Sequence, residues 1–189
     1  MLSRAPDKES PGADVNRLRL FHVSEEGAVA RFDPRPVTAG EVRVNGNVVW
    51  AIDEAHLPNY LLPRDCPRVT YVCSTETSDA DRELFFGISK ARRVIAIEPE
   101  WLERAMTTPI YQYELPIPGF ECIDGDAGHY VTRNAVTPLG VRRIDAPLAE
   151  LLRYDVELRV LKDLRLFHAA VSRSTLSFST TRLRNAITA

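Results

Sequence analysis

The chain has 189 residues, a length that suits one domain and would crowd two. Its 24 basic and 26 acidic side chains give a net charge of -2, which excludes capture of nucleic acid or of an anionic membrane by bulk charge. No apolar run approaches the roughly 18 residues that cross a bilayer, so no membrane partner is expected. Three cysteines without a CxxC pair argue against a disulfide framework and favour a cytoplasmic location.

Residues 1–16 are rich in Pro, Ser, Gly, Asp and Lys and carry no apolar core. We expect them to be a disordered leader and not a secretory signal. Residues 17–189 are predicted to form a single domain. It begins with a strand over residues 17–22, because apolar side chains alternate there as they do along a half-buried strand.

The dipeptide Asn45-Gly46 lies between β-branched residues and is a strong hairpin signal. We expect the hairpin to span residues 42–53, with a nearly all-apolar and therefore buried second arm over residues 48–52. Before it, the two prolines of residues 32–36 predict a turn.

Asp53 can cap a short helix over residues 55–62, which Pro58 limits to about one turn on each side. Strands and helices then intersperse, but most strands are short and regular βαβ spacing is absent. The sequence therefore predicts an α+β fold with a bent, split, mainly antiparallel sheet and short flanking helices. The expected strands are 66–74, 93–97, 111–115, 120–123, 129–136, 141–144 and 156–161, the helices 79–86, 99–106, 147–154 and 163–171, and residues 175–184 end the chain.

Several common functional motifs are missing from the sequence. GxGxxG, GxxxxGK[ST], GxSxG and HExxH do not occur, which argues against a Rossmann or P-loop nucleotide site, a nucleophile elbow and a helical zinc site. Asp124 and Asp126 lie in a stretch like a calcium loop, but Ala135 occupies the position of the bidentate Glu. We expect a turn there and predict no metal.

Three segments occur in an order that resembles the strand motifs of the ADP-ribosyltransferase fold. They are Leu20-Phe-His-Val-Ser24, Val48-Val-Trp-Ala-Ile-Asp53 with Tyr60 behind it, and His129-Tyr-Val-Thr-Arg-Asn-Ala-Val136. They are similar to the His–Tyr–Glu branch, which poly(ADP-ribose) polymerases and diphtheria-type toxins share. The resemblance covers roughly residues 18–144 and implies an ADP-ribosyltransferase-like fold with an NAD site.

The resemblance also implies roles for individual residues. His22 would hydrogen-bond a ribose hydroxyl of NAD, Trp50 would replace the Tyr that stacks on nicotinamide, and Tyr60 lies near a second stacking Tyr. His129 stands where the family has its catalytic Glu, and Val23 replaces a Gly that lets nicotinamide approach. A His cannot supply the negative charge that stabilises an oxocarbenium-like transition state. Weak or no transferase activity is therefore implied.

Over its whole length the chain resembles more closely a family of small bacterial proteins of unknown function. The stretches VWAIDEAHLPNYLLPRDCPRV and STLSFSTTRLRNA carry this resemblance. It implies no activity.

The candidate ligand is NAD, a related nucleotide or another phosphorylated small molecule. Each candidate residue has a structural alternative: a core or edge position on a strand, packing at a helix end, or a solvated turn. The candidate catalytic residues are His22 and His129, and the candidate cofactor-binding residues are Ser24, Trp50, Tyr60 and Arg64.

Two other functions stay open. The chain can be a binding module without catalysis, or a hydrolase in which His22 or His129 is the general base. An unrelated hydrolase needs a His paired with a carboxylate outside the predicted NAD cleft.

Two basic clusters have both a functional and a structural interpretation. Arg64, Asp65 and Arg68 surround Cys66 and can form a surface ion-pair cluster. Alternatively, the two arginines can grip a phosphate or lower the pKa of the thiol. Residues 157–189 carry six basic and two acidic side chains beside a run of Ser and Thr hydroxyls. That segment is either a solvated strand face or part of a pocket for phosphate, nucleotide or RNA.

Overall fold

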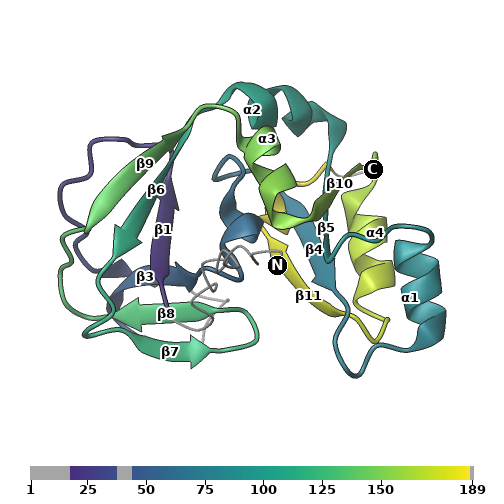
Figure 1. Cartoon of the computed structure of the whole chain (residues 1–189), viewed down its shortest axis with the longest axis horizontal. Coiled ribbons are helices and arrows are strands. Elements are labelled where there is room, and N and C mark those ends of the chain that lie inside the picture. The colour runs from purple at the N-terminus through teal and green to yellow at the C-terminus, as the bar shows by residue number, and fades with distance from the viewer. Residues whose placement is uncertain (1–17, 38–43, 188–189) are drawn as a thin grey trace, which may run out of the picture.

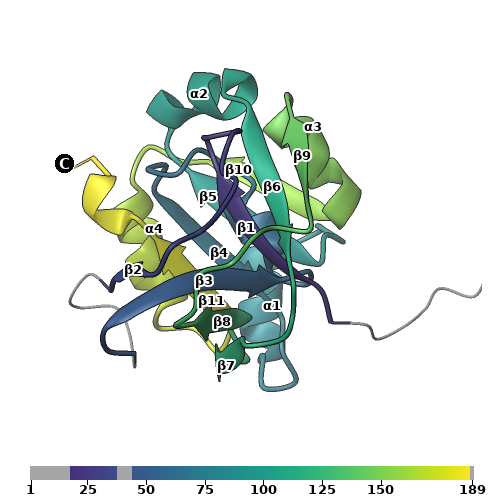
Figure 2. The same ribbon diagram turned by 90° about the vertical axis from the view of Figure 1, so that its left-hand side faces the viewer.

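The computed structural model describes residues 18–37 and 44–187, so the predicted leader over residues 1–16 lies outside the described residues. The fold is α+β, with two mainly antiparallel sheets and a few short helices (Figure 1). Viewed from the side of the larger sheet, the strands of the smaller sheet lie behind those of the larger one (Figure 2).

The larger sheet contains all three segments of the ADP-ribosyltransferase resemblance. Each of its strand pairs is antiparallel. Its order is β7 (Glu121–Asp124), β8 (His129–Thr132), β3 (Asn47–Asp53), β1 (Leu20–Ser24), β6 (Ile110–Leu115) and β9 (Gly140–Ile144), and β2 (Arg35–Pro36) pairs with β3.

The smaller sheet combines strands from distant parts of the chain. Its pair β5–β10 is parallel and its other pairs are antiparallel. The order is β10 (Val156–Val160), β5 (Arg93–Ile97), β4 (Arg68–Val72) and β11 (Ser177–Thr181). The α-helices are α1 (Asp79–Phe86), α2 (Leu102–Thr107), α3 (Pro147–Leu151) and α4 (Leu164–Val171), and the 3-10 helices are η1 (Leu57–Tyr60), η2 (Pro99–Trp101), η3 (Leu152–Tyr154) and η4 (Leu183–Asn185).

Strand alternation divides the buried side chains into layers. Phe21 and Ile52 of the larger sheet pack with Ile95 and Ile97 of the smaller sheet, so this cluster fills the space between the sheets. A second cluster lies between the smaller sheet and helices α1 and α4. A third, which includes Tyr113, covers the opposite face of the larger sheet.

The predicted turn over residues 32–36 is wrong in part. Its last two residues form β2 and pair with the first two residues of β3. Pro36 is tolerated there because β2 pairs only with β3 among the described strands, and a proline at an edge removes no central ladder bond. The second arm of the predicted hairpin is β3, and residues 42–43 of its first arm lie outside the described residues. The tight turn predicted at Asn45-Gly46 is wrong, because Asn47 and Val48 pair with Pro36 and Arg35 of β2.

The predicted strand over residues 129–136 ends early, at Thr132. The Thr132 hydroxyl accepts a hydrogen bond from the backbone N–H of Asn134 at 3.3 Å, and the chain bends there. Pairing resumes at one position, where Val136 bridges Phe32.

The predicted helix over residues 55–62 is also shorter in the structure. Only the 3-10 helix η1 forms, with Pro58 in its first turn. Likewise, the predicted helix over residues 147–154 divides into α3 and η3. The helices expected at 79–86 and 163–171 are confirmed as α1 and α4.

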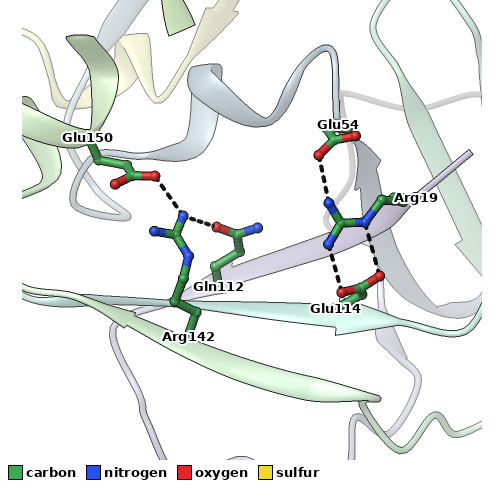
Figure 3. Close-up of polar contacts among 6 residues, drawn as sticks. All are labelled: Arg19, Glu54, Gln112, Glu114, Arg142 and Glu150. Atoms are coloured by element: carbon green, nitrogen blue, oxygen red, sulfur yellow. Dashed lines mark hydrogen bonds and ion pairs between the residues drawn. The ribbon is translucent and has the colours of Figure 1, made fainter. Parts of the chain in front are cut away.

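An ion-pair network fixes the turn between β3 and η1 to the larger sheet (Figure 3). Both guanidinium edges of Arg19 are used: Nε and Nη2 bind Glu114 at 3.1 and 2.8 Å, and Nη1 binds Glu54 at 2.8 Å. The hydrogen bonds from Arg19 to Glu114 lower the pKa of the Glu114 carboxyl. All three groups are substantially exposed, so the network orients the turn more than it stabilises the fold. A second network joins Arg142 to Gln112 and Glu150.

Candidate functional site

Three of the predicted site residues form one cluster on the face of the larger sheet that looks toward the smaller sheet. Trp50 of β3 and His129 of β8 come from paired strands, and their rings meet edge to face at 5.7 Å between centroids. Tyr60, the last residue of η1, has its hydroxyl 2.8 Å from His129 Nε2. Burial lowers the pKa of His129 and so favours its neutral form, and the tautomer with its proton on Nδ1 accepts the Tyr60 O–H at Nε2. We call Trp50, Tyr60 and His129 the aromatic–imidazole cluster.

His22 reaches this cluster from the opposite face of the sheet. Its ring lies 4.7 Å from that of Phe32, which packs on Tyr113 in the outer layer. Its Nδ1 lies 2.9 Å from the backbone oxygen of Trp50. Because a carbonyl only accepts, Nδ1 carries the proton, and neutral His22 keeps a lone pair on Nε2.

Burial is the main cause that lowers the pKa of His22, and the positive charges of Arg64 and Arg35 add to it. Both arginines are exposed. Their effect on His22 places cationic charge near this end of β1. The other predicted residue, Ser24, accepts a hydrogen bond from the backbone N–H of Glu26 at 3.0 Å. Ser24 thus has a local structural role at the end of β1.

The surroundings of Cys66 differ from two of the three sequence interpretations. Cys66 and Arg68 are buried, and Arg68 Nη1 donates to the carbonyl oxygens of Pro63 and Cys66 at 3.2 and 2.9 Å. Burial raises the pKa of the Cys66 thiol to about 11 and outweighs the attraction of the nearby arginines. The ideas of a surface ion-pair cluster and of an activated thiol are therefore wrong.

A polar cleft of about 240 Å³ lies between the two sheets. One wall comes from β4, β5 and β11, and the other from η1 and the turn that joins β7 to β8. We call it the inter-sheet cleft. Its polar lining consists of Thr70, Arg93, Ser177 and Ser179 on one side and His56, Asn59, Asp124 and Asp126 on the other.

A histidine–carboxylate pair stands at one side of the inter-sheet cleft. Asp53 Oδ1 accepts the backbone N–H of His56 at 2.9 Å and lies 2.8 Å from His56 Nδ1. The carboxylate fixes the tautomer with the proton on Nδ1, which leaves Nε2 as a base. From the sequence, Asp53 was predicted only to cap a helix. Its position three residues before His56 was the signal that could have indicated the pair.

Gly128 makes room for this pair. Its φ is +67°, and a Cβ at this position would collide with the His56 ring and the Asp53 carboxylate. The carbonyl of Gly128 also accepts the backbone N–H of Asp53 at 3.0 Å. The β7–β8 turn and the turn after β3 are thereby joined.

Two residues that line the inter-sheet cleft each have one side-chain polar atom that is closed to solvent and has no hydrogen-bond partner. The two atoms are Asn59 Oδ1 and Arg93 Nε, and within the described residues only Arg68 Nε shares this condition. Asn59 is 6% exposed. Each unsatisfied buried group costs about 1–3 kcal/mol. Because both atoms are closed to solvent, this cost lies inside the protein and not at the surface of the cleft.

The structure assigns local roles to other candidate groups. Asp124 Oδ1 accepts the backbone N–H of Ala127 at 3.0 Å, which confirms the turn expected at this position.

Across residues 18–37 and 44–187, no group of three or more His, Cys, Asp or Glu side chains could hold a metal ion. In the same part of the chain no helix is long and apolar enough to cross a membrane.

Most arginines of the basic C-terminal stretch make contacts within the molecule. Arg159 pairs with Glu157 at 2.6 Å, and Arg182 with Asp65 at 3.8 Å. Arg165 donates to the carbonyl of residue 186 and Arg173 to that of residue 169. The hydroxyls of this stretch behave differently, since Ser177 and Ser179 line the inter-sheet cleft.

The geometry thus defines a two-sheet α+β protein with a polar cleft between its sheets. The chain belongs to a family of unknown function, DUF6886, whose model matches residues 21–186. No curated protein and no solved structure matches the chain. These comparisons add no support to the resemblance to ADP-ribosyltransferases.

Replacing Gly128 by Ala should destabilise the protein by about 1–3 kcal/mol, because the left-handed backbone and the His56 ring both oppose a Cβ. Urea unfolding would measure the change. Gly125→Ala is the matched control, since its Cβ would meet nothing closer than 3.9 Å, and it should stay within about 0.5 kcal/mol. Equal stability of the two variants would contradict the role assigned to Gly128.

Stability should fall on acidification because His22 and His129 both have a lowered pKa in the fold. Below the ordinary histidine pKa of 6.5, the unfolded chain binds more protons at these two side chains than the folded chain does. The free energy of unfolding should therefore decrease from about pH 7.5 to about pH 5.5. His22→Asn, which keeps an N–H donor near Nδ1 and does not titrate, should show a smaller decrease. An unchanged pH dependence in this variant would contradict the assignment.

Proposed function

We propose that this protein binds NAD or a related nucleotide at the aromatic–imidazole cluster, with weak or no transferase activity. One observation carries the proposal. The three segments that resemble ADP-ribosyltransferase motifs lie on three adjacent strands, in the order β8, β3, β1. The side chains of Trp50, His129 and Tyr60 contact one another in series, and His22 joins them through the backbone oxygen of Trp50.

The chemistry of these groups suits the parts of a nucleotide. Trp50 is only partly buried and offers an aromatic ring on which a planar base or nicotinamide can stack. The resemblance assigns the ribose contact to His22, but its ring lies on the opposite face of the sheet, so a ribose hydroxyl at the cluster is left to Tyr60 and His129. Arg35 and Arg64 supply the positive charge that phosphate groups need near the same end of β1.

Weak or absent catalysis follows from the residue at the position of the family's Glu. His129 lies beside the Tyr60 hydroxyl, and its imidazole, neutral or protonated, carries no negative charge for an oxocarbenium-like state. Asp124 lies opposite His129 in the β7–β8 register. One of its oxygens, however, is used to hold the turn before β8.

A hydrolase is the second candidate, and the Asp53–His56 pair favours it. A general base needs a fixed tautomer and a free ring nitrogen at a cavity, and His56 lines the inter-sheet cleft. This geometry favours His56 as the base over His22 and His129. The Nδ1 of His22 is bound to a backbone carbonyl, and the Nε2 of His129 is bound to Tyr60.

The nucleotide proposal is tested by thermal unfolding with NAD, ADP-ribose, AMP and inorganic phosphate. A nucleotide at 100 times its Kd should stabilise the fold by about 2.7 kcal/mol, seen as a higher Tm. Trp50→Ala should lose this shift. Trp101→Ala, which removes a partly buried Trp from η2, should keep it. If no nucleotide raises the Tm of the folded wild-type protein, the proposal is wrong.

The hydrolase candidate predicts turnover of simple chromogenic esters that depends on His56. His56→Gln should lower kcat/KM by about 100-fold or more, because general-base catalysis contributes roughly that much. His129→Gln should leave the rate nearly unchanged. Equal activity in wild-type protein and in His56→Gln would eliminate this candidate.

A further inference from the structure

We propose that the inter-sheet cleft binds a small zwitterion, such as a free amino acid, which carries one cationic and one anionic end. The site is separate from the aromatic–imidazole cluster, and the proposal requires neither nucleotide binding there nor catalysis by His56. Its basis is that the two walls of the cleft carry charges of opposite sign that do not form an ion pair with each other.

The smaller sheet supplies the positive charge. Arg93 of β5 lines the cleft and forms no ion pair with any described residue. Of its side-chain nitrogens only Nε is closed to solvent, so the two Nη groups remain open to a molecule in the cleft. Ser177 lies in the same row of the sheet, because Val72 pairs with Arg93 on one side and with Ser177 on the other. A guanidinium edge and a hydroxyl both donate hydrogen bonds to a carboxylate, so this wall suits an anionic end.

The opposite wall supplies negative charge and an acceptor nitrogen. Asp124 and Asp126 line the cleft from the β7–β8 side, and neither forms an ion pair with a described residue. Asp124 uses Oδ1 to hold its turn, which leaves Oδ2 for a ligand. His56 binds Asp53 through Nδ1, so its Nε2 is a further acceptor at this wall. An ammonium group only donates hydrogen bonds, and it therefore suits this side.

The separation of these charges decides which class of ligand the cleft favours. An anion at Arg93 would be repelled by Asp124 and Asp126, and a cation beside the aspartates would be repelled by Arg93. An uncharged polyol would gain from neither charge. A zwitterion is attracted at both of its ends, so it alone uses both walls.

The size of the cleft limits the ligand further. Its volume of about 240 Å³ lies below the range of about 300–1,000 Å³ that is typical for drug-sized ligands. A single amino acid suits this space, whereas a dinucleotide does not. Arg93 is also partly buried, so salt in the solvent screens its charge less than that of a fully exposed arginine.

The test is an NMR titration of the full chain with the standard amino acids, β-alanine and γ-aminobutyrate. The last two are zwitterions in which the charged ends are farther apart. At least one member of this panel should cause saturable shifts in the resonances of cleft residues. Acetylation of its amine, or amidation of its carboxylate, should weaken binding at least about tenfold, because each change leaves one wall without its partner.

Two variants assign the ends of the ligand to the walls. Arg93→Met should weaken binding of the zwitterion at least about tenfold without weakening the amidated form, which has no carboxylate to lose. The double variant Asp124→Asn/Asp126→Asn should weaken the zwitterion equally without weakening the acetylated form. Arg92→Met and Asp155→Asn change exposed residues that do not line the cleft, and they should bind like the wild-type protein.

Stability separates a binding role from a structural one. Arg93→Met removes an unpartnered buried N–H, so its Tm without ligand should equal or exceed that of the wild-type protein. An Asn at position 124 keeps the oxygen that accepts the backbone N–H of Ala127, so the turn should persist. Arg93→Lys keeps the charge and should bind more tightly than Arg93→Met.

Three results would overturn the proposal. The first is that no amino acid of the panel shifts the cleft resonances of the folded protein. The second is that the acetylated and amidated forms bind as well as the free zwitterion. The third is that binding survives in both Arg93→Met and the double aspartate variant, which would place the ligand elsewhere on the molecule.

Discussion

The hydrogen bonds of Asp53 fix the junction on which both candidate sites depend. Its carboxylate holds the backbone and the ring of His56, and its own backbone N–H binds the carbonyl of Gly128. The end of β3, the start of η1 and the β7–β8 turn are therefore one connected unit. Arg19 fixes the same turn from outside through Glu54 (Figure 3).

This junction places η1 between the two sheets, where its residues serve different purposes. Leu57 is fully buried and anchors the segment in the core. The next residues along η1 then reach the two sites: Asn59 lines the inter-sheet cleft, and Tyr60 binds His129 in the aromatic–imidazole cluster. One short 3-10 helix thus positions both sites, and a change that displaces it should affect both together.

Local patterns were sufficient to predict most elements. Apolar alternation located the strands, and the α+β class followed from their short lengths. The errors arose where one side chain redirects the chain, as when the Thr132 hydroxyl binds Asn134 and ends β8 early. Burial was the other source of error, since the charge pattern around Cys66 says nothing about the desolvation that raises its pKa.

The inter-sheet cleft was much harder to predict from sequence. Its walls join residues as distant as His56 and Ser179, which meet only because β11 pairs with β4 at the edge of the smaller sheet. The hydroxyl-rich C-terminal stretch was predicted to be either a solvated strand face or part of a pocket. Ser177 and Ser179 line the cleft, but most arginines of this stretch bind elsewhere in the molecule. The cation in the lining is instead Arg93, whose strand gave no functional signal.

A crystal structure of the protein with ADP-ribose is the most direct test of the account. We predict that the ligand lies against Trp50 and that Asp53 keeps its hydrogen bonds to His56 and Gly128. A ligand bound elsewhere, or a junction without these hydrogen bonds, would contradict the account.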